Sequence, residues 1–386
     1  MKTCSSLVVC VACAAFVTDF IICAIGTMKA WQFLLLAEVV CSLASESLYS
    51  PADSCKGRCN EKYNPRDVCH CNKKCEKYQN CCEDYRIHCG KTNTEGKEKD
   101  TAPDERFSTR DDAITNEELQ EASERLYQSD SNRADESDIV LNKQHFTSKT
   151  KASEDQSPEP LFSYVNEEKL FSKPTYASFI KLLDNYHKKI GTGEEFTPEQ
   201  LKEQDAFLAV IMKTDLMKEL YKFLHSKNRY DSESEFVADL KKMWFGLYSR
   251  GKDDGDSSGF EHVFIGEIKN GKVSGFHNWI HFYLLEKQGT INYFSYNYDG
   301  PWTSYPDVLG LQFKWDGFYK EVGSAFIGSS PEFEFGLYSL CFIVRPGKMC
   351  HLKIGDQNLN IQTYTWDKST YGSGKKYIAT AYVASS

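Results

Sequence analysis

The chain has no excess of positive charge, and its first cysteine-rich segment has almost no large aliphatic side chains. Its 386 residues include 46 Lys and Arg against 55 Asp and Glu, a formal net charge of -9. This balance argues against a protein that coats nucleic acid, because phosphate contacts usually require a basic surface. Cysteine catalysis is also not indicated, since Cys341 and Cys350 lie in no electropositive motif.

The 15 cysteines are too many for a cytosolic enzyme and indicate export. Between residues 55 and 89 there is no leucine, so disulfides must hold this segment together. Zinc is the alternative, because C-x-C and C-x3-C spacings occur beside His70. Eight cysteines allow 105 pairings, which the sequence does not distinguish. The eight are Cys55, Cys59, Cys69, Cys71, Cys75, Cys81, Cys82 and Cys89. Farther along, Cys341 and Cys350 are either paired or two buried thiols.

The N-terminus contains two apolar segments, and together residues 1–44 are interpreted as a targeting region. Residues 7–25 are long enough for a membrane anchor, but Asp19 interrupts them. From Met28 an apolar run is followed by small residues ending at Ala44, the layout of a cleavable secretory signal. We expect translation from Met28, cleavage near Ala44 and a secreted mature protein without a membrane span; a form anchored by residues 7–25 is the alternative.

The remaining chain divides by composition. Residues 51–90 form the cysteine-rich module, residues 91–111 a polar flexible linker, and residues 112–386 a large domain. Apolar side chains at helical spacing recur from Leu119 to Leu247, and strand-like alternation dominates from Gly259 onward. Helices followed by mostly antiparallel strands predict an α+β fold.

Two histidines and a lysine stand out in the C-terminal part. His262 lies in GFEHVFIGEI (259–268), His277 in GFHNWIHFY (275–283) and Lys320 in YKEVGSAFIG (319–328). A general acid and a general base that titrate near neutrality, with a cation beside them, suit transfer of a phosphoryl group. Lys320 and Ser324 are four residues apart, which places them on one side of a strand or a helix.

Local patterns assign these residues to elements. Residues 260–268 alternate, which predicts a strand with His262 on its apolar face. Apolar residues at helical spacing predict a helix from Phe276 to about Lys287, with His277 in the first turn, where the helix dipole disfavours an imidazolium. Beyond the acid–base pair, Glu261 and Glu267 face away from His262 in a regular strand and are candidate ligands of a hard cation.

Several longer segments resemble the EndoU family of poly-uridylate-specific endoribonucleases, related to the nidovirus uridylate-specific endoribonuclease. These are FEHVFIG, GFHNW, residues 312–342 and residues 363–382, which end in IATAY. The resemblance implies that His277 is the general base, His262 the general acid and Lys320 the group stabilising the phosphorane-like state. It also implies that Ser324, Thr380 and Tyr382 hold the uracil.

The implied reaction cuts single-stranded RNA, not DNA, and leaves a 2′,3′-cyclic phosphate and a 5′-hydroxyl. It depends on a divalent cation, with Mn²⁺ ahead of Ca²⁺, and we expect a monomer. Because the chain is acidic, its RNA site must be a local basic patch. The candidate lysines are Lys269, Lys272, Lys314, Lys320, Lys375 and Lys376.

The order CKGRC…CHCNKKC…NCCEDY…C resembles a somatomedin B domain. Relatives of that type bind a protein partner through an acidic residue, a leucine and two adjacent aromatics. The corresponding positions here are Asn72, Lys74, Lys77 and Tyr78, of which only the last matches. An extracellular partner of another kind is therefore expected. The alternative function is an extracellular adhesion or scaffold protein with a catalytically idle RNA-binding domain.

Overall fold

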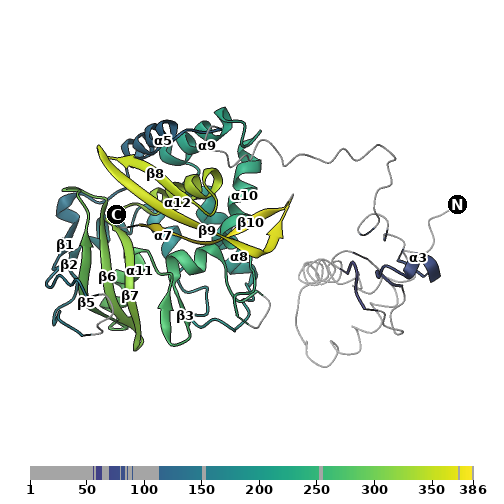
Figure 1. Cartoon of the computed structure of the whole chain (residues 1–386), viewed down its shortest axis with the longest axis horizontal. Helices are drawn as coiled ribbons and strands as arrows, with labels where there is room; N and C mark the ends of the chain where they lie inside the picture. The colour runs from purple at the N-terminus through teal and green to yellow at the C-terminus, as the bar shows by residue number, and fades with distance from the viewer. Residues whose placement is uncertain are drawn as a thin grey trace, which may run out of the picture. The chain divides into compact units, whose positions relative to one another are not determined.

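The computed structural model describes residues 113–149, 154–251, 255–372 and 374–384, and parts of the segment 55–89. The chain separates into two compact units, Met1–Lys99 and Asp100–Ser386, which are treated individually here (Figure 1). The expected signal or anchor in residues 1–44 and the linker 91–111 lie outside the described residues. Among the residues that are described, no helix is both long and apolar enough to cross a membrane.

Disulfides form the core of the first unit. The bonds join Cys55 to Cys71, Cys59 to Cys89, Cys69 to Cys82 and Cys75 to Cys81. The half-cystines 55, 71, 75 and 82 are buried around the short helix α3 (Cys75–Tyr78). The sulfurs of residues 55, 71 and 82 lie within 4.8 Å of one another, but all three are in disulfides, so the zinc alternative does not hold here.

Helices with well-formed N-caps begin the second unit. Thr115 and Thr197 each make a capping box, which satisfies two orphan backbone N–H groups at the helix start. Pro198 occupies the first turn of α8, as its fixed φ favours. The helices are α5 (Asn116–Ser129), α6 (Glu167–Leu170), α7 (Pro174–Ile180), α8 (Pro198–Ile211), α9 (Asp215–Ser226) and α10 (Glu233–Phe245).

Two main sheets follow. The larger has the strand order β3-β4-β7-β6-β5, antiparallel except for the β4–β7 pair. The smaller is the antiparallel meander β10-β9-β8. The strands are β3 (Glu267–Lys269), β4 (Lys272–Ser274), β5 (Ile291–Asp299), β6 (Asp307–Trp315), β7 (Phe318–Ile327), β8 (Met349–Ile354), β9 (Gln357–Tyr371) and β10 (Lys375–Val383). A short pair, β1 (Ile139–Leu141) with β2 (Phe162–Val165), precedes them. This arrangement confirms the α+β prediction.

The helix α12 (Pro331–Val344) is buried along its whole length and forms the centre of the second unit. It packs against α9, α7 and strands β9 and β10, while α11 (Trp279–Lys287) covers the larger sheet (Figure 1). Cys341 lies inside α12 and bonds Cys350 on β8. Of the two alternatives for Cys341 and Cys350, a disulfide or two buried thiols, the structure contains the disulfide. Although strand-like alternation was expected to dominate from Gly259 onward, residues 331–344 form this helix.

Two local predictions around the histidines were also wrong. Residues Glu261–Ile265 form a π-helical turn instead of a strand, and β3 begins only at Glu267. The turn is buried on every side, so its apolar residues do not reveal one face. The following helix begins at Trp279 with Asn278 as its N-cap, which leaves His277 just before the helix.

Candidate active site

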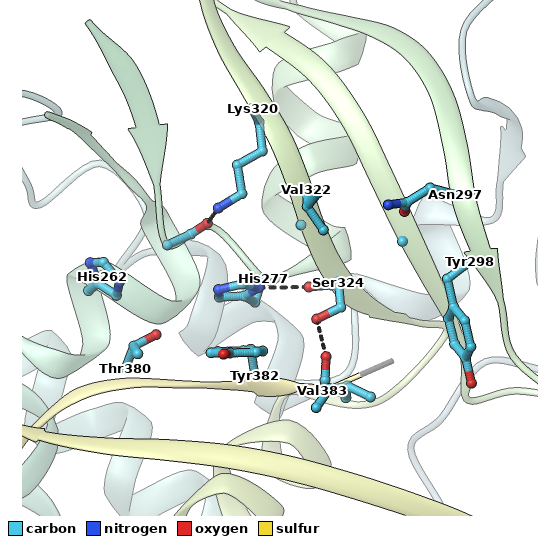
Figure 2. A pocket seen from close by; sticks show the side chains of 14 residues that line it. His262, His277, Asn297, Tyr298, Lys320, Val322, Ser324, Thr380, Tyr382 and Val383 are labelled. Carbon is cyan, nitrogen blue, oxygen red and sulfur yellow. Dashed lines mark hydrogen bonds between the residues drawn. The ribbon is translucent and has the colours of Figure 1, made fainter. Parts of the chain in front are cut away.

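One pocket lies where the π-helical turn, the start of α11, β7 and β10 meet. Its volume is about 520 Å³. All six residues predicted for catalysis and base binding line it, and Figure 2 shows them around the same hollow. The lining residues are His262, Gly275, His277, Asn297, Tyr298, Gly310, Lys320, Val322, Gly323, Ser324, Thr380, Tyr382, Val383 and Ala384.

A tight backbone approach brings the two histidines together. The N–H of Phe276 donates to the carbonyl of His262 at 3.0 Å, and the N–H of His277 donates to Val263 at 2.7 Å. Gly275 makes this possible, because it has φ +66° and a Cβ there would lie 1.8 Å from the His262 carbonyl oxygen. The G-F-H sequence is thus a local requirement for placing His277 beside His262.

His277 is buried and oriented by β7. Its Nδ1 lies 2.8 Å from the carbonyl oxygen of Ser324, so Nδ1 carries the proton and Nε2 is the basic nitrogen (Figure 2). Burial, together with the charge of Lys320, holds the pKa of His277 well below its usual value. The ring is therefore neutral at pH 7, although the cause is burial, and His277 does not lie within the helix turn as predicted.

His262 is oriented by a carboxylate. Its Nδ1 lies 2.5 Å from Oε2 of Glu267, which also faces Arg250 Nε at 3.5 Å. Burial lowers the pKa of His262, and the Glu267 carboxylate partly offsets that shift. Although burial opposes its ionisation, the pKa of Glu267 is lowered by the facing His262 and Arg250. The expectation that Glu267 points away from His262 was wrong, because the chain turns at Gly266 instead of continuing as a strand.

Lys320 contributes a buried ammonium group to the pocket. Its Nζ donates to the carbonyl oxygen of Gly275 at 2.5 Å (Figure 2). Burial lowers the pKa of Lys320 to about 8, so most of it stays protonated at pH 7. Lys320, Val322 and Ser324 alternate along β7 and all face the pocket, which confirms that Lys320 and Ser324 share one side. The pocket thus holds two imidazoles and a cation.

The residues predicted to hold a base line the pocket from two strands, Ser324 from β7 and Thr380 and Tyr382 from β10. Ser324 Oγ donates to the carbonyl oxygen of Val383 at 2.6 Å, while Thr380 Oγ1 is buried and has no hydrogen-bond partner among the described residues. The ring of Tyr382 is stacked with the ring of His277, at 5.4 Å between centroids, and with that of Tyr364, at 6.4 Å.

The other lysines of the predicted basic patch do not line the pocket, which has Lys320 as its lysine. Lys272 pairs with Glu321 at 2.6 Å and Lys375 with Asp239 at 2.9 Å. Lys376 lies 3.9 Å from Asp367. These side chains therefore balance acidic neighbours, and the positive potential in the pocket comes mainly from Lys320.

The candidate metal ligands do not form a cation site together. Glu267 has both oxygens engaged, by Ser257 on one side and by His262 and Arg250 on the other. Glu261 is buried, neither of its oxygens has a hydrogen-bond partner in the described part of the chain, and burial next to Glu267 raises its pKa well above its usual value. Mn²⁺ and Ca²⁺ take about six or more oxygen ligands. Apart from the disulfide sulfurs, no group of three ligating side chains is found in the described part of the chain.

Some functional features gave no usable sequence signal. Arg250 donates to the Tyr248 hydroxyl and to the carbonyl of Ala379, which ties the Glu267 carboxylate to β10. His281 is buried and stacks on Phe276 at 5.0 Å between ring centroids, because α11 packs its first turn inward. Residues 255–259 match G-x-S-x-G, but Ser257 is fully buried and donates to Glu267, so it is not a nucleophile.

Comparisons with known proteins find endoribonucleases, which agrees with a pocket that holds two imidazoles and a cation. The family model for endoribonuclease XendoU matches residues 118–383, and that for the somatomedin B domain matches residues 53–92. The chain is 62% identical to the uridylate-specific endoribonuclease of Mus musculus over 346 residues, covering 89% of this chain and 81% of the relative. It is 53% identical to that of Paralichthys olivaceus over 381 residues, covering 91% and 99%.

A solved structure extends the likeness to the fold. The structure of XendoU, described as a splicing-independent snoRNA-processing endoribonuclease, matches with a TM-score of 0.57 and 37% sequence identity. The match covers 69% of this chain and 97% of the other. From the family match over most of its length and from these relatives, the chain belongs to the XendoU endoribonuclease family and carries a somatomedin B domain before its nuclease domain.

Proposed function

We propose that the pocket cleaves single-stranded RNA 3′ of uridylates through attack of the substrate's own 2′-hydroxyl on phosphorus. His277 Nε2 takes the hydroxyl proton, and His262 Nε2 delivers a proton to the departing 5′-oxygen. The products are a 2′,3′-cyclic phosphate and a 5′-hydroxyl, so atoms and protons balance without water. The main support is that both buried imidazoles are held through Nδ1, by Ser324 and by Glu267, which leaves each Nε2 for the substrate.

Lys320 has the role of stabilising charge on the phosphoryl oxygens. An ammonium group that is already buried needs little reorganisation when the transition state forms, which makes it more effective than a solvated one. Ser324, Thr380 and Tyr382 form the base-binding wall, with the partnerless Thr380 hydroxyl available for a hydrogen bond to the substrate.

Enzymes of this family depend on a divalent metal ion. We propose Mn²⁺, with Ca²⁺ as the second choice, and assign no catalytic step to it because Glu261 and Glu267 do not fit as a ligand pair. For the whole chain we propose a secreted monomer, with the module at 51–90, the linker at 91–111 and the nuclease domain at 112–386. The disulfides support an oxidising compartment.

The direct test is cleavage of fluorogenic oligonucleotides that contain one uridine or none, with Mn²⁺, with Ca²⁺ and with a chelator. We expect cleavage only at the uridine and only with a divalent cation, and mass spectrometry should find a 2′,3′-cyclic phosphate on the 5′ product. A linear 3′-phosphate formed from the start, or equal cleavage without uridine, would contradict the proposed chemistry.

The pH dependence follows from the two imidazoles. The rate constant kcat/KM requires His277 neutral and His262 protonated in the free enzyme. Because the pKa of His262 is lowered, His262 loses its proton at a pH below the usual histidine range. The fall of kcat/KM with rising pH should therefore begin below that range. The Glu267 carboxylate raises the pKa of His262 against burial, so Glu267→Gln should move this high-pH limb to still lower pH and leave the low-pH limb in place.

The measurement is kcat/KM against pH for the wild type and Glu267→Gln. Glu321→Gln, on β7 and half exposed beside Lys272, serves as the control for removing a carboxylate. A high-pH limb that stays in place in Glu267→Gln would show that this carboxylate does not set the protonation of His262.

A further inference from the structure

A β-bulge turns one additional polar side chain toward the pocket. In the pairing of β5 with β6, Tyr296 is opposite Leu311 and Tyr298 is opposite Gly310, so Asn297 has no partner residue on β6. Consecutive residues of a regular strand face opposite sides of a sheet. Asn297 and Tyr298 nevertheless both line the pocket. The irregularity redirects the Asn297 side chain, as bulges beside active sites often do.

Gly310 provides the space that the Asn297 amide occupies. A Cβ at position 310 would lie 2.2 Å from Asn297 Oδ1 and 2.9 Å from Tyr298 Cβ. On its other side Gly310 is in register with Ser324 of β7. Asn297 and Ser324 therefore belong to strands on either side of β6, about two strand spacings or roughly 10 Å apart at the backbone. Their side chains flank the glycine, and Figure 2 shows the Asn297 amide extending toward Val322 and Ser324.

The amide oxygen of Asn297 forms no hydrogen bond that would hold the fold together in the part of the chain that the structure describes. Asn297 Oδ1 is buried without a hydrogen-bond partner in the described structure. In contrast, the neighbouring amide of Gln312 on β6 donates to the Glu321 carbonyl and accepts from Ser295. Buried polar groups are nearly always satisfied, so an unsatisfied amide at a ligand pocket is expected to find its partner in the ligand.

We propose that Asn297 is a specificity-determining residue that hydrogen-bonds the polar edge of the uracil base. This inference rests on the proposed function, which places the ribose at the histidines and the base toward Ser324. Asn297 then lies beyond Ser324, at the far edge of the base, where uracil has its O4 acceptor and N3–H donor. The unpartnered Oδ1 accepts from the uracil N3–H and the amide nitrogen donates to O4, whereas cytosine has no hydrogen on N3 and carries an amino group in place of O4. Val322, 49% exposed and two residues before Ser324 on β7, offers an apolar surface for the base.

The test is the ratio of kcat/KM for oligonucleotides with a single uridine or a single cytidine, in the presence of Mn²⁺. Asn297→Asp keeps the shape but replaces the donor by an acceptor, so it should repel O4 and accept from the cytosine amino group. We expect the uridine-to-cytidine ratio to fall about tenfold or more, as in sites that recognise a substrate through a buried polar group. Asn358→Asp, exposed on β9, controls for the added negative charge.

Asn297→Ala is a second, independent variant for this test if Asn297→Asp does not fold. It should raise KM for the uridine substrate and lower the ratio while the thermal midpoint stays near that of the wild type. An unchanged ratio in the folded variants, or an equal loss on both substrates, would overturn the role of Asn297. Failure of the proposed function is distinguishable, because the wild type itself would then leave the uridine substrate uncut.

Discussion

Replacing His277 with alanine should reduce kcat/KM on a uridine-containing oligonucleotide by about 10²–10⁴-fold, because the 2′-hydroxyl loses its general base. The structure shows why this loss is expected for His277 in particular. His277 is the imidazole whose Nδ1 is bonded to the Ser324 carbonyl, and burial keeps the ring neutral at the pH of the assay. Single-turnover cleavage with saturating enzyme measures the chemical step directly, without the contribution of product release.

His351→Ala is the matched control, because His351 is exposed on β8 and bonds only Asn360 among the described residues. Its activity should equal that of the wild type. Thermal unfolding of both variants should show that His277→Ala remains folded, since its ring lines a pocket and the backbone contact to Val263 is independent of the side chain. A folded His277→Ala variant with wild-type cleavage would exclude the assigned base.

Replacing Lys320 with alanine should have the second-largest effect, a loss of about 10²–10³-fold in kcat, by analogy with removal of one group that stabilises developing charge. Lys320 also lowers the pKa of both histidines. Its removal should therefore raise both pKa values, and the remaining activity should have its pH optimum at higher pH than that of the wild type. This shift separates an electrostatic role from simple loss of packing.

The measurement is a pH profile of the residual activity, with Lys218→Ala on the exposed face of α9 as control. Lys320→Arg keeps the charge but not the compact ammonium that donates to Gly275, so it should recover only part of the rate. If Lys320→Ala loses activity but its pH optimum stays in place, the lysine does not act on the histidines through its charge.

Sequence patterns predicted some elements correctly and failed at the π-helical turn for a physical reason. The helical spacing of apolar side chains from Leu119 to Leu247 is a local pattern, and helices are found there, so local sequence was sufficient in that region. The segment 260–268 alternates like a strand, but it is enclosed by α10, α12 and the sheets, and full burial removes the contrast between faces on which periodicity depends.

The amino-acid sequence alone determined the chemistry that is available: two histidines, one lysine and a cysteine-rich module, in motifs specific enough to indicate the family. Only the tertiary structure decided that Glu267 orients His262, that the metal candidates do not pair, and that Asn297 reaches the pocket. These relations depend on a turn at Gly266, on strand register and on a bulge. The register and the bulge join segments far apart in the chain, and the turn at Gly266 lies in a segment that is buried on every side. The energy of a buried side chain depends on partners that its own neighbours in sequence do not specify.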